Sequence, residues 1–379
     1  MRLVAPFGFY GWGNIGDEAT LQGFARLVSR HDNRTRAWVA SRNPAHTARV
    51  EPYFSYYKAV GRDLRRRWAR YRATAAVVAG GTPIMDVLGR WPLHEVAPLV
   101  VAASAQRKPF AFIGCGTEGL QREESRRVVA DILAPRVCHW SVRSERDKQR
   151  LTDYGVRSER ITVAADMAWL LDAVSPVFGQ ALLSQLGVKL DRFTIGVNVN
   201  IERFVRERQP LLLRIVAELL DKLIDQHDAQ VIFLCNEVRE GDTFDAAASR
   251  EVVAAMRHPE RTILVPNHYW APQQMLSLIA CCRLAISTRY HSCLFSALQG
   301  VPFVALQRSG KVADLCRDMD WPHGASLDDL DASRLFAMCS EIHDGERALS
   351  DFLHARAEAM RSKAWTNRVA LDAMRTLEA

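Results

Sequence analysis

Short apolar runs rich in β-branched residues alternate with longer segments of helical periodicity through most of this 379-residue chain. Because strands separated by helical segments usually pair in parallel, the alternation predicts βαβ units and an α/β fold. The predicted strands are residues 3–8, 35–40, 75–79, 110–114, 139–142 and 161–164 in the first half and 194–199, 230–234, 262–266, 284–287 and 303–306 in the second.

The chain is longer than the usual size of one hydrophobic core, so two domains of roughly 150 to 200 residues are expected. Residues 173–191 carry serine, proline and glycine without a clear strand pattern, which is typical of a domain boundary. We predict two Rossmann-like domains facing a cleft, residues 1–175 and 190–330, with helices from residues 331–379 packing over the body. In open α/β sheets, ligands bind at the carboxyl ends of the strands.

The composition is that of a folded protein with a modest excess of positive charge. Hydrophobic residues make up 48% of the chain and charged residues 25%, and the net charge of +7 favours anionic partners. Part of this excess lies between Arg62 and Arg72, a predicted helix with six arginines, Trp68 and Tyr71. The segment is either a solvated helix face or a contact with an anionic membrane or a polyprenyl phosphate. We expect no nucleic-acid partner.

The first ten residues lack the layout of a signal peptide, and no stretch reaches the roughly 18 uninterrupted apolar residues of a spanning helix. We therefore expect a cytoplasmic protein, either free or peripheral to the inner face of the membrane. The eight cysteines include no CxxC pair and no histidine at metal-ligand spacing. We predict buried thiols, without a disulfide or a metal site, and the oligomeric state stays open.

The first motif lies directly after the first predicted strand, where four glycines occur within residues 8–16. Such glycines let backbone amides approach an anion closely, and the following helix favours negative charge at its N-terminus. We predict that Asn14 and Gly16 contact a substrate and that Asp17 takes part in catalysis. The alternative is a tight strand-to-helix turn with Asp17 as the helix cap.

The second motif places Gly80, Gly81 and, a few residues later, Asp86 after another predicted strand. The glycines would admit a ligand, and the Asp86 carboxylate could accept a proton or orient a hydroxyl. Close packing of the chain is an equally good reason for two glycines at the end of a strand.

The third motif is an arginine, Arg143, at the end of a strand that should be central in the sheet. An unpaired buried arginine is unfavourable, so its guanidinium either meets an internal carboxylate or points at an anionic ligand.

The strongest pattern is a strand that ends near Ser287 and is followed by a helix predicted to begin at Ser292. Arg289 and His291 stand at the turn between them. If this turn is extended, the two side chains share a face, because side chains alternate along an extended chain. A guanidinium binds carboxylate or phosphate bidentately, and an imidazole can transfer a proton near neutral pH. A histidine bonded to the local backbone is the alternative.

We place Ser292 in the same predicted substrate-binding set. Lys311 follows the next predicted strand and is either another cation of this site or a surface lysine.

At these four motifs, and in matching order, the chain resembles the polysaccharide pyruvyl transferase family. Members carry a GNIGDE-like loop, a glycine-rich strand end, an arginine turn and an R-L-H-[AS] turn, which correspond here to residues 13–18, 80–86, 142–147 and 289–292. The resemblance covers about residues 5–320. Tyr290 stands where leucine is usual, and Thr82 stands where a further glycine is common.

The resemblance implies a glycosyltransferase-B-like pair of domains, with the acceptor on residues 1–175 and the donor, phosphoenolpyruvate, on residues 190–330. Arg143 and Arg289 would hold the carboxylate and phosphate of the donor, and His291 would be the general acid. The donor's methylene carbon would be protonated, and a sugar hydroxyl would attack the resulting cation. Loss of phosphate and attack by a second hydroxyl would complete a ketal.

The other roles implied by the resemblance concern the acceptor. Asp17 and Asp86 would orient its hydroxyls, and no metal or further cofactor would be required. The acceptor would be a sugar of a cell-surface glycan or of its precursor, carried on a lipid, on a nucleotide or in a polymer.

Two other classes of function fit the same pattern. A glycosyltransferase of this architecture with a nucleotide-sugar donor would need an acidic residue for the ribose, which Glu237 or Glu240 could supply. A non-catalytic subunit of a glycan assembly complex would use the basic helix around Trp68 to lie on a membrane, and it would not depend on His291.

Overall fold

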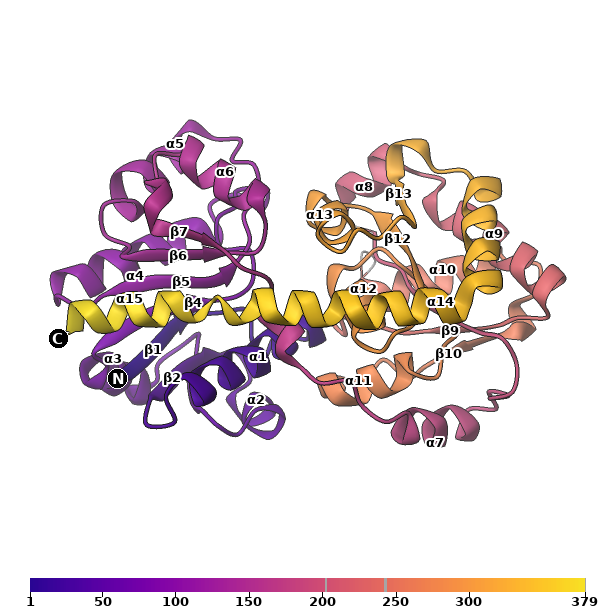
Figure 1. The fold of residues 1–379 in the computed structure, drawn as a ribbon, viewed down its shortest axis with the longest axis horizontal. Helices are drawn as coiled ribbons and strands as arrows, with labels where there is room; N and C mark the ends of the chain where they lie inside the picture. The colour runs from indigo at the N-terminus through magenta and orange to yellow at the C-terminus, as the bar shows by residue number, and fades with distance from the viewer. Residues whose placement is uncertain (202, 242–243, 379) are drawn as a thin grey trace. The chain divides into compact units, whose positions relative to one another are not determined.

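The computed structural model describes residues 1–201, 203–241 and 244–378, and it divides into two compact domains (Figure 1). The first domain comprises Met1–Trp12, Asp17–Leu171 and Met360–Ala379, and the second comprises Gly13–Gly16 and Asp172–Ala359. A short piece of the N-terminal loop therefore belongs to the second domain, and the C-terminal end of the chain belongs to the first.

The first domain is built on a seven-stranded sheet in the order β3-β2-β1-β4-β5-β6-β7, with all neighbours parallel. Its strands are β1 (Arg2–Phe7), β2 (Arg36–Ser41), β3 (Ser55–Lys58), β4 (Ala75–Ala79), β5 (Phe110–Cys115), β6 (His139–Val142) and β7 (Ile161–Val163). Every residue of β4 and β5 is buried, as expected for strands covered on both faces.

The second domain has a six-stranded parallel sheet in the order β10-β9-β8-β11-β12-β13. Its strands are β8 (Thr194–Asn198), β9 (Gln230–Phe233), β10 (Thr262–Leu264), β11 (Leu284–Ser287), β12 (Phe303–Gln307) and β13 (Gly324–Ser326). In the pairing of β8 with β11, Asn198 lies opposite Ser287 at the carboxyl ends of both strands.

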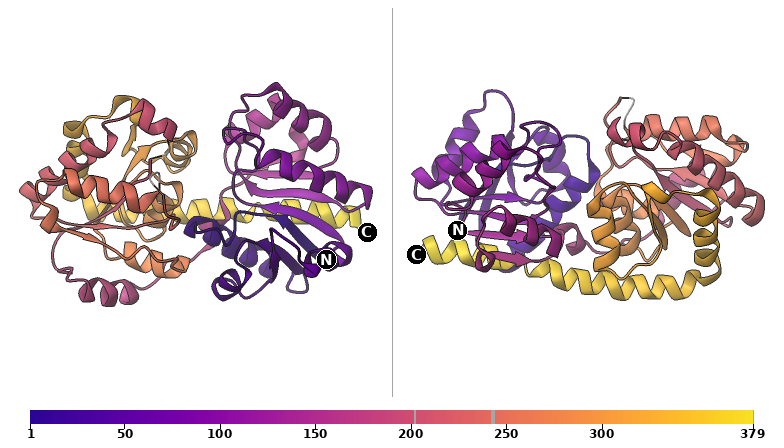
Figure 2. Two further views of the ribbon diagram at one scale, coloured as in Figure 1. Left: turned by 180° about the vertical axis from the view of Figure 1, so that it is seen from behind. Right: turned by 90° about the horizontal axis from the view of Figure 1, so that it is seen from above.

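Helices lie on both faces of each sheet (Figures 1 and 2). The helices that begin among the residues before Leu171 are α1 (Ile15–His31), α2 (Pro44–Val50), α3 (Leu64–Arg72), α4 (Leu93–Ala105), α5 (Glu123–Arg127) and α6 (Glu145–Asp153). Those that follow are α7 (Val177–Gln185), α8 (Arg203–Arg208), α9 (Leu212–His227), α10 (Asp245–Ala255), α11 (Pro272–Ile279), α12 (Tyr290–Leu298), α13 (Gly310–Asp318), α14 (Ala332–Trp365) and α15 (Arg368–Glu378).

In each sheet, the strands are added first on one side of the domain's first strand and then on the other. The order therefore switches between β1 and β4 in the first domain and between β8 and β11 in the second. In sheets of this kind, ligands bind at the carboxyl ends of the strands that flank this point. The loops that follow β1, β4, β8 and β11 are therefore the places where a site is expected.

All eleven predicted strands are present, with ends that differ by at most two residues. The prediction of two Rossmann-like α/β domains is confirmed. Two strands were not predicted, β3 and β13, and both lie at sheet edges. The helix after β11 begins at Tyr290, two residues earlier than predicted.

Candidate functional site

The carboxyl ends of β8 and β11 carry a polar cluster in the second domain. The Asn198 side chain donates to the backbone oxygen of Leu234 at 2.6 Å and to Oδ2 of Asp245 at 2.9 Å. It also accepts a hydrogen bond of 3.4 Å from the Ser287 hydroxyl. Because these bonds join three strand ends to the start of α10, the cluster is anchored by the sheet itself.

Asp245 is fully buried and holds the guanidinium of Arg289. Its Oδ1 accepts from Nε and Nη2 of Arg289 at 3.1 and 2.5 Å. Its Oδ2 accepts from the backbone amides of Asn236 and Glu237 at 2.9 and 3.0 Å. An ion pair that is buried and also hydrogen-bonded fixes its members in one geometry. Arg289 therefore presents a guanidinium of fixed orientation at the end of β11.

Glu237 is a second buried carboxylate beside this arginine. Its Oε2 lies 4.0 Å from Nη1 of Arg289 and accepts from Nδ2 of Asn14 at 3.3 Å, and its Oε1 accepts from Nε of Arg239 at 2.7 Å. Burial raises the pKa of Glu237 above its usual value, although Arg239 and Arg289 act in the opposite direction. The structure thus gives Glu237 internal partners.

The loop Gly13–Gly16 is attached to the segment after β9. The amide of Ile15 donates to the backbone oxygen of Asn236 at 2.9 Å, and the amide of Val238 donates to that of Gly13 at 2.7 Å. Oδ1 of Asn14 accepts from the amide of Gly16 at 2.9 Å, which is the bond of a helix N-cap. Asn14 thus precedes the first residue of α1 as its cap, and Asp17 lies within the first turn.

His291 lies against the backbone of Gly16. A Cβ placed on Gly16 would be 2.1 Å from Nδ1 of His291, so only glycine leaves space for the imidazole. The condition under which Arg289 and His291 would share a face, an extended turn, is not met, because α12 already begins at Tyr290. Arg289 is the extended residue before the helix, and His291 and the buried Ser292 lie in its first turn.

Two basic residues follow β12, the neighbour of β11. The half-buried Arg308 donates from Nη1 to Oδ1 of Asn200 at 3.0 Å, and the amide of Asn200 donates to the Thr288 hydroxyl at 2.9 Å. These bonds connect Arg308 to the residue just before Arg289. Lys311 is the second residue of α13. Arg308 was not predicted as a site residue, although its position directly after a strand was a usable signal.

In the first domain, Arg143 is buried at the end of β6. Its Nη1 lies 3.1 Å from Oδ2 of the buried Asp166, and its Nη2 donates to the Thr82 hydroxyl at 3.1 Å. A Cβ on Gly116 would be 1.8 Å from Nη2, so this glycine makes room for the guanidinium. Of the two environments considered for Arg143, the structure shows the internal carboxylate.

The residues after Arg143 form a helix cap. The Ser144 hydroxyl accepts from the amide of Asp147 at 3.2 Å and donates to its Oδ2 at 2.8 Å. Oδ1 of Asp147 accepts from the amide and hydroxyl of Thr117 at 2.6 and 2.8 Å. A serine cap with an acidic residue three positions later is a frequent helix start. This part of the motif therefore has a local structural reason.

Gly80 and Gly81 both have a φ of +69° at the end of β4, a conformation that favours glycine. A Cβ on Gly80 would lie 2.1 Å from Cγ2 of Thr20, and one on Gly81 would lie 2.3 Å from the ring of Phe9. Backbone conformation and close packing thus account for both glycines, and their contact with a substrate stays a prediction.

Asp86 accepts hydrogen bonds from the backbone before α5. Its oxygens lie 2.9–3.1 Å from the amides of Gln121 and Arg122. Burial acts to raise the pKa of Asp86, but the hydrogen bonds from these two amides, together with the Ser125 hydroxyl and the charge of Arg122, hold it below its usual value. The structure gives this carboxylate an anchoring role, and its catalytic role stays a prediction.

The glycine loop after β1 is held by buried groups of the same domain. The Glu18 carboxylate accepts from the amide of Gly11 at 2.6 Å, and the Tyr10 hydroxyl donates to the backbone oxygen of Ala79. Asp17 is half-buried next to Glu18. The first domain thus contains Asp17, Gly80, Gly81, Asp86 and Arg143 of the predicted set, and the second contains Asn14, Gly16, Arg289, His291, Ser292 and Lys311.

Among the described residues, no three His, Cys, Asp or Glu side chains are grouped so that they could hold a metal ion. Nor does any helix in the described part of the chain have the length and apolar character needed to cross a membrane.

Comparison with solved structures shows the fold. Anabaena HepE in complex with UDP-glucose is 13% identical, with a TM-score of 0.67 over 99% of each chain. A UDP-GlcNAc 2-epimerase from Neisseria meningitidis bound to UDP-GlcNAc is 9% identical, with a TM-score of 0.65 over 99% of this chain and 100% of the other. A glycosyltransferase from Rickettsia africae is 11% identical, with a TM-score of 0.64 over 99% and 98%. The predicted glycosyltransferase-B-like fold is confirmed.

No curated protein matches the chain in sequence. The family model of the polysaccharide pyruvyl transferases, in contrast, matches residues 14–310, well over half of the chain. This range includes all four motifs from which the resemblance was inferred, apart from the first residue of the first motif. The chain therefore belongs to the polysaccharide pyruvyl transferase family and is a transferase.

Proposed function

We propose that this enzyme transfers the pyruvyl group of phosphoenolpyruvate to two hydroxyls of one sugar in a cell-surface glycan or its precursor, with release of phosphate. The observation that supports this most directly is the arrangement at the start of α12. There, His291 packs on Gly16 beside Arg289, whose guanidinium is oriented by Asp245.

The donor would bind at the carboxyl end of the second domain's sheet. Asp245 holds Nε and Nη2 of Arg289, so the donor carboxylate would bind on the Nη1 side of the guanidinium. Arg308 and Lys311 follow the neighbouring strand and would hold the phosphate. The first turn of α12, with Ser292, adds backbone amides that favour an anion. Asn14 and Gly16 would form the wall of this site. No metal is needed for the proposed reaction.

The reaction would begin with transfer of a proton from His291 to the methylene carbon of phosphoenolpyruvate, which becomes a methyl group. A sugar hydroxyl then attacks the cationic carbon and returns its proton to the imidazole. The C–O bond to phosphate breaks, a second hydroxyl attacks the same carbon, and its proton leaves with the phosphate. A phosphate dianion beside the imidazole favours its protonated form, and the cations stabilise the leaving charge.

The acceptor would bind to the first domain. Asp17 would orient a hydroxyl, and Gly80 and Gly81 would let the sugar approach the backbone. Asp86 and Arg143 we assign to positioning, because their charged groups hold the strand ends in place. We also propose that the enzyme acts in the cytoplasm and contacts the membrane through the Arg62–Arg72 segment.

A nucleotide-sugar glycosyltransferase is the second candidate, because HepE and the epimerase are described with UDP-sugars bound. Of the two acidic residues proposed for a ribose, Glu240 is exposed, whereas Glu237 is buried with Asn14 and Arg239 as partners.

The reaction can be tested by product analysis in deuterated water. The full chain is incubated with phosphoenolpyruvate and a panel of glycosides with free hydroxyl pairs. We expect release of phosphate together with a ketal whose methyl group carries one deuterium from the solvent. His291→Gln should abolish both products, and Arg250→Ala, an exposed change in the same domain, should keep them.

Two outcomes would refute the proposal. One is a ketal formed at the wild-type rate by His291→Gln. The other is sugar transfer from a UDP-sugar to the same glycosides with no consumption of phosphoenolpyruvate, which would establish the second candidate.

A further inference from the structure

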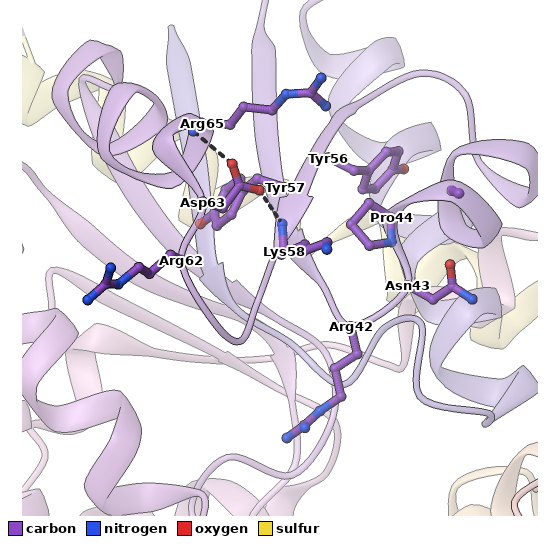
Figure 3. Close-up of a pocket in the computed structure, with 10 residues that line it drawn as sticks. Arg42, Asn43, Pro44, Tyr56, Tyr57, Lys58, Arg62, Asp63 and Arg65 are labelled. Atoms are coloured by element: carbon purple, nitrogen blue, oxygen red, sulfur yellow. Dashed lines mark hydrogen bonds between the residues drawn. The ribbon is translucent and has the colours of Figure 1, made fainter.

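A basic pocket lies at the carboxyl ends of β2 and β3 in the first domain (Figure 3). Its volume is about 500 Å³, within the range of small-molecule sites. Four cationic side chains and one carboxylate line it. The cations are Arg42, Lys58, Arg62 and Arg65, and the carboxylate is Asp63.

The carboxylate serves to shape the wall of the pocket. Oδ2 of Asp63 accepts from the amide of Lys58 at 2.8 Å, and Oδ1 accepts from the amide of Arg65 at 2.9 Å (Figure 3). The bond from Lys58 is the main reason that the pKa of Asp63 is lowered. Both oxygens thus bind backbone amides of residues 58–65, the segment from the end of β3 to the start of α3 that carries three of the four cations.

The side chains of Lys58, Arg62 and Arg65 are exposed, and the charge of Arg65 also contributes to the lowered pKa of Asp63. The fourth cation, Arg42, stacks on Trp12, with its guanidinium carbon 3.7 Å from the ring centroid. Figure 3 shows the Arg42 side chain extending away from Lys58 and Asp63. Several cations around one pocket favour a ligand with more than one negative charge, such as a diphosphate.

The helix that starts at this pocket exposes apolar side chains. Leu64 is 80% exposed, Trp68 53% and Tyr71 81%, which is unusual for residues of this size. Their spacing of four and three residues places them on one face of α3. The ring of Trp68 packs edge-on against Trp38 of β2, 5.1 Å between centroids, so the stripe is attached to the sheet. An anion site next to exposed apolar side chains fits a diphosphate that bears a lipid.

We propose that the basic pocket binds the diphosphate through which the acceptor sugar is attached to a lipid carrier, with α3 contacting the lipid. The identity of the sugar rests on the proposed function, whereas binding of the diphosphate does not. Diphosphate is also present in nucleotide-linked sugars, so the test separates the two carriers.

The test is isothermal titration of the full chain with inorganic pyrophosphate, farnesyl diphosphate and UDP. Pyrophosphate should bind, and farnesyl diphosphate should bind more tightly. The double variant Lys58→Ala, Arg62→Ala should weaken the binding of both ligands by at least about tenfold, because it removes two charge-assisted contacts to the diphosphate. Arg49→Ala, an exposed arginine of α2 outside the pocket, is the matched control and should change the binding of neither ligand.

The apolar stripe is tested separately with Leu64→Ser, Tyr71→Ser. This variant should weaken the binding of farnesyl diphosphate and leave the binding of pyrophosphate unchanged. Pyrophosphate binding that is unaffected by the loss of Lys58 and Arg62 would overturn the pocket assignment. If UDP binding depends on these two residues and farnesyl diphosphate does not bind, the assignment of a lipid carrier is refuted.

Phosphoenolpyruvate titrated into the same variants separates this inference from the proposed function. Donor binding should survive in Lys58→Ala, Arg62→Ala. If the wild type binds pyrophosphate through these residues but never binds phosphoenolpyruvate, the pocket stands and the proposed function fails.

Discussion

The imidazole of His291 occupies the space that a side chain at position 16 would need, with Nδ1 only 2.1 Å from the place of a Cβ on Gly16. The two residues are far apart in the sequence and belong to separate motifs of the family. Their contact gives the glycine of the N-terminal loop a defined function, which is to let the imidazole lie directly on the backbone of α1.

We expect Gly16→Ala to displace His291 and to reduce transfer by at least about tenfold, because small misplacements of a reacting group lower rates by such factors. The free energy of unfolding should fall by about 1–3 kcal/mol through overpacking. Product formation and chemical denaturation measure the two effects. Gly119→Ala is the control, since a Cβ there meets no atom within 4 Å. Full activity of Gly16→Ala would show that the contact does not position the imidazole.

The buried pair Arg143–Asp166 predicts a coupled effect on stability. Arg143→Met should lower the free energy of unfolding by about 3–5 kcal/mol, because it leaves the Asp166 carboxylate buried without its cation. The double variant Arg143→Met, Asp166→Asn should lose less free energy of unfolding than the sum of the losses in the two single variants. Urea denaturation of all four proteins gives the coupling energy. Strict additivity would contradict the inferred pairing.

We expect Asp86 to make a pH-dependent contribution to stability. Its pKa is lowered in the folded state, so its stabilising effect is present above the unfolded pKa of about 3.8 and is lost as the pH falls through the lower folded value. Asp86→Ala should reduce the free energy of unfolding by about 1–3 kcal/mol at pH 7, since two backbone amides lose their acceptor. The difference from the wild type should shrink below pH 3.8. A constant difference from pH 7 to pH 3 would disprove this role.

Much of the fold is predictable because buried parallel strands consist of short runs of apolar residues. β4 reads AAVVA and β5 reads FAFIGC, and both are buried along their whole length. The edge strands β3 and β13 escape prediction for a physical reason. β3 is only Ser-Tyr-Tyr-Lys, with two adjacent tyrosines between polar ends, and β13 is only Gly-Ala-Ser, so their pairing depends on the adjacent strand rather than on their own pattern.

The candidate site is predictable in part. The position of Arg289 after a strand identified it, but its partner Asp245 begins a helix 44 residues earlier, and only the sheet order brings the two together. The same holds for Arg143, since Asp166 follows the edge strand β7. Sequence spacing can indicate that a buried charge needs a partner, but the choice between an internal carboxylate and a ligand depends on the tertiary fold.

The central claim is that the start of α12 binds phosphoenolpyruvate, and titration calorimetry of the full chain tests it most directly. We predict saturable binding to the wild type and to Arg250→Ala. Binding should be at least about tenfold weaker in Arg289→Lys, which keeps the charge but loses the planar fork. UDP should not compete. Binding that is unchanged in Arg289→Lys, or binding of UDP with none of phosphoenolpyruvate, would contradict the claim.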